Sequence, residues 1–198
     1  MPTPTAALLA AAALLAAPAK ESWDTVTRPE VRAEFLPRTA LVEVDGKEVG
    51  RGYAIVEVSD PGRSLKVRVS APGFEPAEAV VEAGKVVNRE YVLALRPAGF
   101  ERRADPADAA SMALAAAALV RADRLDDAVD YATQSLKVGN TPLANRVLGD
   151  VWRRRGDRDQ ATRYYAMYLS LAKDPADGAE IKAYLMQPRP GDISMPEK

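Results

Sequence analysis

The sequence of 198 residues contains no cysteine and no histidine. Without cysteine there can be no disulfide, no thiolate ligand for a metal and no lipid-modified cysteine. Without histidine, the most frequent general base and metal ligand is missing, and so is every Ser-His-Asp or Cys-His catalytic arrangement. We therefore expect a protein that is not an enzyme and that uses no metal or cofactor.

An excess of charge of either sign is also missing. The 27 Lys and Arg residues nearly balance the 28 Asp and Glu residues, and the formal net charge is −1. A chain with this balance has no overall field that would attract nucleic acid or an anionic membrane surface. Apolar residues make up 47% of the chain and charged residues 28%, which is typical of a soluble globular protein.

The longest apolar run, residues 6–17, is too short to span a bilayer, which takes about 20 residues. Its length suits the hydrophobic region of a signal peptide, and Ala17-Pro18-Ala19 has the small-x-small form of a cleavage site. We predict export to the periplasm, with cleavage after Ala19 and no stable membrane span. The stretch before the run has no Lys or Arg, so an uncleaved weak anchor and a simple alanine-rich helix remain as alternatives.

Residues 37–96 have the pattern of short strands, whereas the mixed segment 20–36 has no assignable pattern. Apolar and polar residues alternate in 64–70 ("SLKVRVS"), as expected for a half-buried antiparallel strand. Four further strands are predicted at 39–44, 53–58, 78–83 and 86–95, with Gly- and Pro-rich turns between them that include 45–50. Five such strands predict a small antiparallel β-sandwich.

This region resembles a PEGA domain, a small extracytoplasmic β module. The resemblance depends on 42–47 ("VEVDGK") with Gly50, on 61–63 ("PGR") and on 71–74 ("APGF"). The namesake Pro-Glu-Gly-Ala element is represented by 37–40 ("PRTA"), which matches only at its ends. The resemblance implies an envelope-associated module without a defined ligand.

The second half of the sequence predicts helices. A linker is expected at 97–106 and a helical domain at 107–187, followed by a disordered tail at 188–198. Helices are predicted at 107–122, at 124–138, from Thr141 to Gly156, from Asp157 to about Ala172, and from Asp174 to a point before Pro188. Thr141 and Asp157 are suitable N-caps, and Pro142 suits the first helical position. The fold class is therefore α+β in separate modules.

A shift of 33 residues superimposes the helical half on itself, with Ala128 on Ala161 and Pro142 on Pro175. Such a period indicates a stacked array of helical hairpins. The second copy resembles a tetratricopeptide repeat in 148–152 ("LGDVW") and 161–165 ("ATRYY"). The resemblance implies two repeats plus a capping helix, with a concave surface that often holds an extended peptide or a partner helix.

When the concave positions of the repeat family are carried over residue by residue onto this sequence, the resemblance places five charged side chains on that surface: Arg121, Arg146, Asp150, Arg153 and Arg154. A row of arginines can clamp a carboxylate or an acidic peptide. The alternative is a solvated charged face that binds nothing. The tyrosines at 164, 165, 168 and 184 are expected to pack between helices rather than to form a binding platform.

The function predicted from these patterns is that of a non-catalytic periplasmic adaptor or scaffold, which binds a protein partner in a cell-envelope assembly. The alternative is a cell-wall or polysaccharide binder that uses the β module, where Lys66 and Arg68 give one strand a basic face. An enzyme is the weakest interpretation. The carboxylate pairs at 126–127 and 157–159 lie at helix starts, where Asp acts as a cap.

Overall fold

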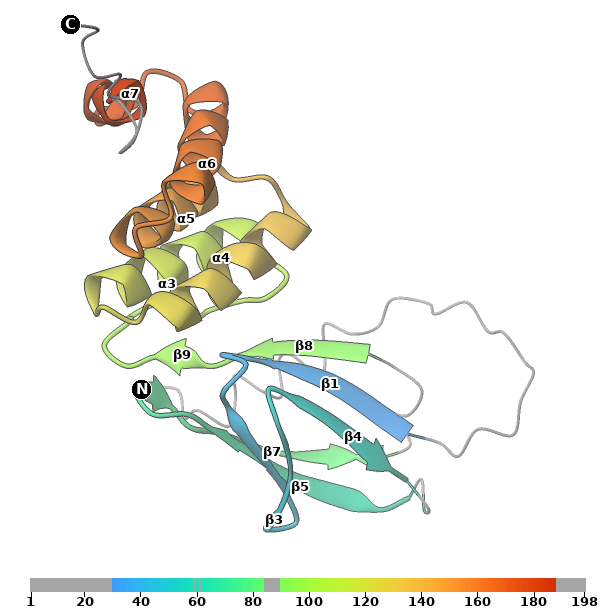
Figure 1. The fold of residues 1–198 in the computed structure, drawn as a ribbon. Coiled ribbons are helices and arrows are strands. Elements are labelled where there is room, and N and C mark those ends of the chain that lie inside the picture. The colour runs from blue at the N-terminus through green and yellow to red at the C-terminus, as the bar shows by residue number, and fades with distance from the viewer. Residues whose placement is uncertain (1–29, 59, 61, 84–89, 188–198) are drawn as a thin grey trace, which may run out of the picture.

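The computed structural model describes residues 30–58, 60, 62–83 and 90–187, which form a β module followed by five helices (Figure 1). The predicted signal peptide at 1–19 and tail at 188–198 lie outside these residues. The strands are β1 (Glu30–Leu36), β2 (Leu41–Val44), β3 (Lys47–Arg51), β4 (Tyr53–Glu57), β5 (Ser64–Ser70), β6 (Phe74–Glu75), β7 (Ala77–Glu82), β8 (Glu90–Ala94) and β9 (Arg96–Pro97). The fold is α+β, as predicted.

The described strands form a three-stranded sheet in the order β4-β1-β8, a four-stranded sheet in the order β3-β2-β5-β7, and the short pair β6-β9. All pairings are antiparallel except β1 with β8. The two larger sheets face each other. Val31 and Val56 of the first pack in one apolar cluster with Val44 and Leu65 of the second. Alternate residues of β2, β4 and β5 are therefore turned towards the space between the sheets.

Four of the described strands were not predicted: the short β6 and β9, which pair with each other, and the longer β1 and β3. β1 lies in the segment that had no assignable pattern, and β3 occupies most of the stretch predicted as a turn. Only Asp45 and Gly46 form that turn, with φ of 50° and 78°, and they join Val44 to Lys47 as a two-residue hairpin loop. β3 was missed because its side chains are charged or exposed, so the strand has no apolar alternation.

The helices are α3 (Ala109–Arg121), α4 (Leu125–Val138), α5 (Pro142–Arg154), α6 (Arg158–Leu171) and α7 (Gly178–Met186). The predicted N-caps of two helices are confirmed, because the side chain of Thr141 accepts from Ala144 N and that of Asp157 from Gln160 N. α7 begins later than predicted, since Pro175 lies in the turn before it and Asp177 is its N-cap.

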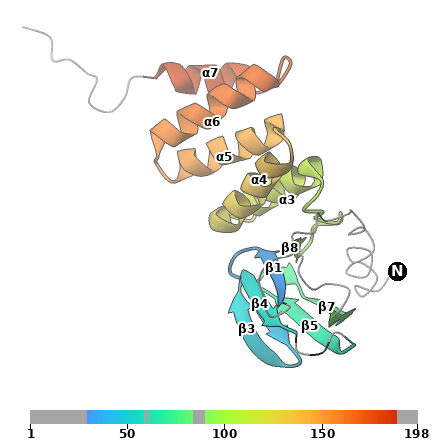
Figure 2. The same cartoon turned by 90° about the vertical axis from the view of Figure 1, so that its right-hand side faces the viewer.

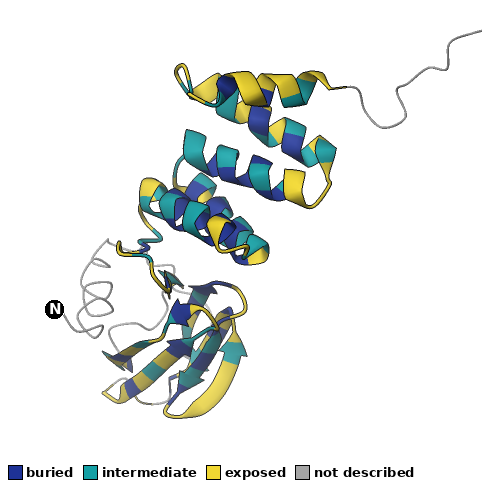
Figure 3. Ribbon diagram, turned by 90° about the vertical axis from the view of Figure 1, so that its left-hand side faces the viewer, coloured by how far each residue is buried: buried dark blue, intermediate teal, exposed yellow. Residues whose placement is uncertain are grey.

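The helices form successive hairpins. α3 packs on α4 and α5 on α6, while α5 also contacts both helices of the first hairpin and α7 packs on α6. The order from the β module is α3 and α4, then α5, α6 and α7 (Figure 2). Buried residues gather where helices face one another, and α7 is largely exposed (Figure 3). The helical half is thus a stack rather than a ring of helices around one axis.

One close approach within the second hairpin depends on a glycine. A Cβ added at Gly149 would lie 2.4 Å from Cδ1 of Tyr165, whose side chain is fully buried. The ring of Tyr165 therefore lies directly against the backbone of α5. The missing side chain at Gly149 thus lets α6 approach α5 closely.

The β module is packed on the first hairpin. A single apolar cluster extends from Phe35 and Val42 through Phe74 to α3, α4 and α5. The ring of Tyr131 stacks on Phe74 with centroids 5.9 Å apart, and its hydroxyl donates to the carbonyls of Leu36 and Leu95. These contacts cover the side of the first hairpin that has no helical neighbour.

Candidate partner-binding surface

The five predicted surface residues lie on two helices of the stack. Arg146, Asp150, Arg153 and Arg154 are on α5, and Arg121 is the last residue of α3. The structure separates them into two groups. Arg146 and Asp150 belong to a network between α5, α6 and α7, whereas Arg121, Arg153 and Arg154 lie at the C-terminal ends of their helices and are exposed.

Arg146 is the centre of the network. Its Nε lies 2.5 Å from Oδ2 of Asp177, and its guanidinium also forms an ion pair with Asp150. The same guanidinium lies 5.4 Å from the centroid of the Tyr165 ring. Its side chain is only 20% exposed, so Arg146 holds α5 against α6 and α7 and is poorly placed to bind a partner.

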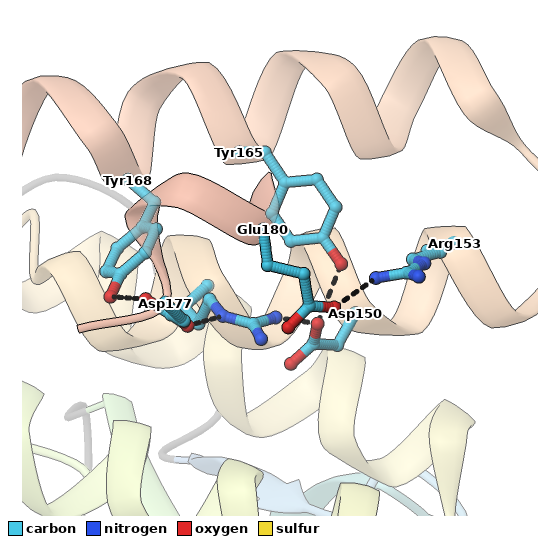
Figure 4. Close-up of polar contacts among 7 residues, drawn as sticks. Asp150, Arg153, Tyr165, Tyr168, Asp177 and Glu180 are labelled. Atoms are coloured by element: carbon cyan, nitrogen blue, oxygen red, sulfur yellow. Dashed lines mark hydrogen bonds and ion pairs between the residues drawn. The ribbon is translucent and has the colours of Figure 1, made fainter. Parts of the chain in front are cut away.

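Two tyrosine hydroxyls complete the network (Figure 4). Tyr165 donates to Oδ1 of Asp150 and Tyr168 to Oδ1 of Asp177, each at 2.7 Å. Tyr165 also meets Tyr184 of α7 edge-on, with centroids 5.5 Å apart. The tyrosines pack between helices, as predicted, and do not form an open platform.

The environment lowers the pKa of the Asp177 carboxyl and raises the pKa of the two phenols, and both shifts favour the protonation states that form these hydrogen bonds. Desolvation opposes ionisation of Asp177, but hydrogen bonds from Arg146 and Tyr168 outweigh it and lower the pKa of its carboxyl. Desolvation, together with the hydrogen bond to Asp177, raises the pKa of Tyr168 to about 12. Desolvation likewise raises the pKa of Tyr165. Near neutral pH the carboxylate of Asp177 accepts and both phenols donate.

Arg153 lies between the network and solvent. Its Nη1 donates to Oε1 of Glu180 at 3.2 Å, and its guanidinium lies 4.9 Å from the centroid of the Tyr184 ring. The hydrogen bond with Glu180 raises the pKa of Arg153. The side chain stays 44% exposed and that of Glu180 65%. A carboxylate from another molecule can reach Arg153 from solvent, in competition with Glu180.

Arg154 and Arg121 lie together at the junction of the two hairpins. Nη1 of Arg154 donates to the carbonyl of Val120, at the end of α3, over 2.9 Å, and lies 3.4 Å from Oδ1 of Asp123. Arg121 follows Val120 and is exposed. Within the described residues, Arg121 makes no ion pair or side-chain hydrogen bond. The exposed arginines therefore gather where α3 and α5 end.

The sequence argument missed three residues of this surface. Two are the carboxylates Asp177 and Glu180, and the third is Tyr168, which was not identified as a hydrogen-bond donor. The 33-residue shift places Asp177 on Ala144 and Glu180 on Val147. The repeat pattern therefore carries no signal for these two carboxylates. Only the packing of α7 brings them to the arginines of α5.

The other charged features singled out from the sequence have structural partners. Asp127 binds Nε of Arg124, and Asp157 caps α6. Arg68 lies between Glu43 and Glu78, with N–O distances of 3.9 and 3.4 Å, so the strand predicted to present a basic face is largely neutralised. Among the described residues there is no cluster of three or more potential metal ligands. None of the described helices has the length and apolar character that a bilayer crossing requires.

No protein-family model matches the chain, and no curated protein matches it either.

Proposed function

We propose that this protein is a non-catalytic adaptor in the bacterial periplasm, where it binds a protein partner in a cell-envelope assembly. The surface used is the side of the helical stack to which α3, α5 and α7 contribute, the concave surface of a tetratricopeptide-like array. The β module, which resembles a PEGA domain, covers the first hairpin of that array.

The observation that carries this proposal is the group of exposed arginines at 121, 153 and 154. Arg121 has no partner within the described part of the chain, and Arg153 is held towards solvent by Glu180 and Tyr184. Fixed guanidinium groups pair with carboxylates at a smaller entropic cost than mobile ones. This favours a partner with an acidic segment.

The alternative function, a polysaccharide binder, has less support. It depended on a basic face at Lys66 and Arg68, and Arg68 has carboxylates on both sides. We therefore place the contact with the partner on the helices.

The test is co-precipitation from envelope extract with the double variant Arg121→Glu/Arg153→Glu. Both side chains are exposed, so we expect the partner to be lost while the far-UV circular dichroism stays unchanged. The matched control is Arg163→Glu, a charge reversal on the exposed face of α6, which should retain the partner.

Two outcomes would contradict the adaptor proposal. One is retention of the same proteins by the double variant and by the control. The other is co-sedimentation of the double variant with purified peptidoglycan at the level of the unaltered protein, with no protein partner recovered from either.

A further inference from the structure

Glu180 of α7 occupies the exposed arginine of α5 from within the same chain. Its Oε1 accepts a hydrogen bond from Nη1 of Arg153 over 3.2 Å (Figure 4). The side chain of Glu180 is 65% exposed and that of Arg153 44%. An ion pair this open to solvent contributes little to stability, because water screens the attraction and two long side chains must be held in one geometry. The pair can therefore open at a small cost.

Opening of this pair does not require α7 to leave the stack. Ile181 is 1% exposed and packs on residues of α6. The network at Asp177 holds the start of the helix, and Nη2 of Arg158 donates to the carbonyl of Tyr184 near its end, over 3.2 Å. None of these contacts involves Glu180, so its side chain can turn into solvent while the helix stays in place.

Arg153 keeps a support of its own when Glu180 turns away. Its guanidinium lies 4.9 Å from the centroid of the Tyr184 ring. That ring is in turn held edge-on by Tyr165, with centroids 5.5 Å apart. A guanidinium fixed against an aromatic ring pairs with a carboxylate at a smaller entropic cost than a mobile one. The position that Glu180 leaves therefore fits a carboxylate from another molecule.

We infer that Glu180 is an internal competitor for the acidic segment of the partner, and that a carboxylate of that segment replaces it on Arg153. This inference rests on the proposed function, because it concerns the same surface. In the unbound protein the pair is closed. On binding, Arg153 exchanges one carboxylate for another, and Glu180 turns into solvent.

The two arginines of the surface then have different roles. Arg121 makes no ion pair within the described part of the chain, so it can take a carboxylate without displacing one. α3 and α5 are neighbours in the stack. Once an acidic segment is held at Arg121, its next carboxylate is tethered near Arg153, and it competes with the tethered Glu180 at a high local concentration.

The test is an NMR titration of the full chain with a blocked tetraglutamate peptide, followed at the Nε–Hε signal of Arg153. Glu180→Gln removes the competing charge and keeps the size of the side chain. The affinity should rise about two- to fivefold, which is the range that exposed ion pairs give. The matched control is Glu101→Gln, the same change at an exposed residue that makes no ion pair within the described residues. It should leave the affinity unchanged.

Two further backgrounds show whether the gain passes through Arg153. Arg153→Gln should weaken binding of the peptide, and Glu180→Gln should then add nothing, because the contested group is absent. In an Arg121→Gln background the gain should remain, since Arg121 has no internal competitor.

Equal affinities of the unaltered protein and Glu180→Gln would overturn the inference and leave the proposed function standing. So would a gain that persists without Arg153. If the peptide bound to no variant, the inference would be overturned as well. The co-precipitation with Arg121→Glu/Arg153→Glu, which does not depend on Glu180, then decides the proposed function separately.

Discussion

At the scale of single residues, the network around Arg146 shows how a predicted binding residue becomes a structural one. The sequence places Arg146 on the binding side of its helix. The structure surrounds its guanidinium with two carboxylates and the ring of Tyr165. An arginine that is held by two ion pairs in this way stabilises the contact between helices, and its free energy of interaction is not available to a partner.

The network gives a pH-dependent stability. The pKa of Asp177 is lowered in the folded state, so its contribution is present above the unfolded pKa, near 4, and is lost as the pH falls through the lower folded value. We predict that Asp177→Asn reduces the free energy of unfolding at pH 7 by about 1 kcal/mol. The variant should lose less stability than the unaltered protein between pH 5 and pH 2.5, measured by urea unfolding.

Asp174→Asn is the matched control for this prediction. Asp174 has φ of 48°, which asparagine tolerates, and it has no ion pair within the described residues. An identical pH profile for the two variants would contradict the assigned role of Asp177.

At the scale of elements, the stack depends on close approach of α5 and α6. Alanine normally stabilises a helix interior relative to glycine by about 1 kcal/mol. At Gly149 the new methyl group would collide with the buried ring of Tyr165. We predict that Gly149→Ala lowers the free energy of unfolding by about 1–3 kcal/mol, measured by chemical denaturation.

A double-mutant cycle separates the collision from other effects of this substitution. In a Tyr165→Leu background the ring is absent, so Gly149→Ala should become neutral or stabilising. If Gly149→Ala lowered the free energy of unfolding equally in both backgrounds, the collision with Tyr165 would not be the cause of the lost stability.

The elements also show which parts of the fold the sequence could predict. The turn at Asp45-Gly46 and the caps at Thr141 and Asp157 could be predicted from local sequence, because a few adjacent residues determine each of them. β1 was missed, since its place in the sheet depends on β4 and β8 far along the chain, and β3 was missed because its exposed side chains show no apolar alternation. Asp177 was missed for the same reason as β1, because only the packing of α7 brings it to Arg146.

At the scale of the whole molecule, the β module and the first hairpin share one apolar cluster. The hydroxyl of the buried Tyr131 links them through two carbonyls of the β module. We predict one cooperative unfolding transition. We also expect Tyr131→Phe to lower the free energy of unfolding by about 1–2 kcal/mol. Hydrogen exchange should show this loss equally in β5 and in α5.

Tyr164→Phe is the control for the tyrosine substitution, because the hydroxyl of Tyr164 has no hydrogen-bond partner among the described residues. If Tyr131→Phe lowered protection in α5 but not in β5, the two modules would be energetically separate, contrary to the shared cluster.

The central claim is that the side of the stack near the ends of α3 and α5 receives a partner. The most direct measurement is photo-crosslinking in intact cells that produce the protein, with a photoreactive residue at position 121 in one variant and at 163 in another. We predict a discrete adduct with one protein at position 121 and none at 163. Absence of an adduct at 121, or the same adducts at both positions, would contradict the claim.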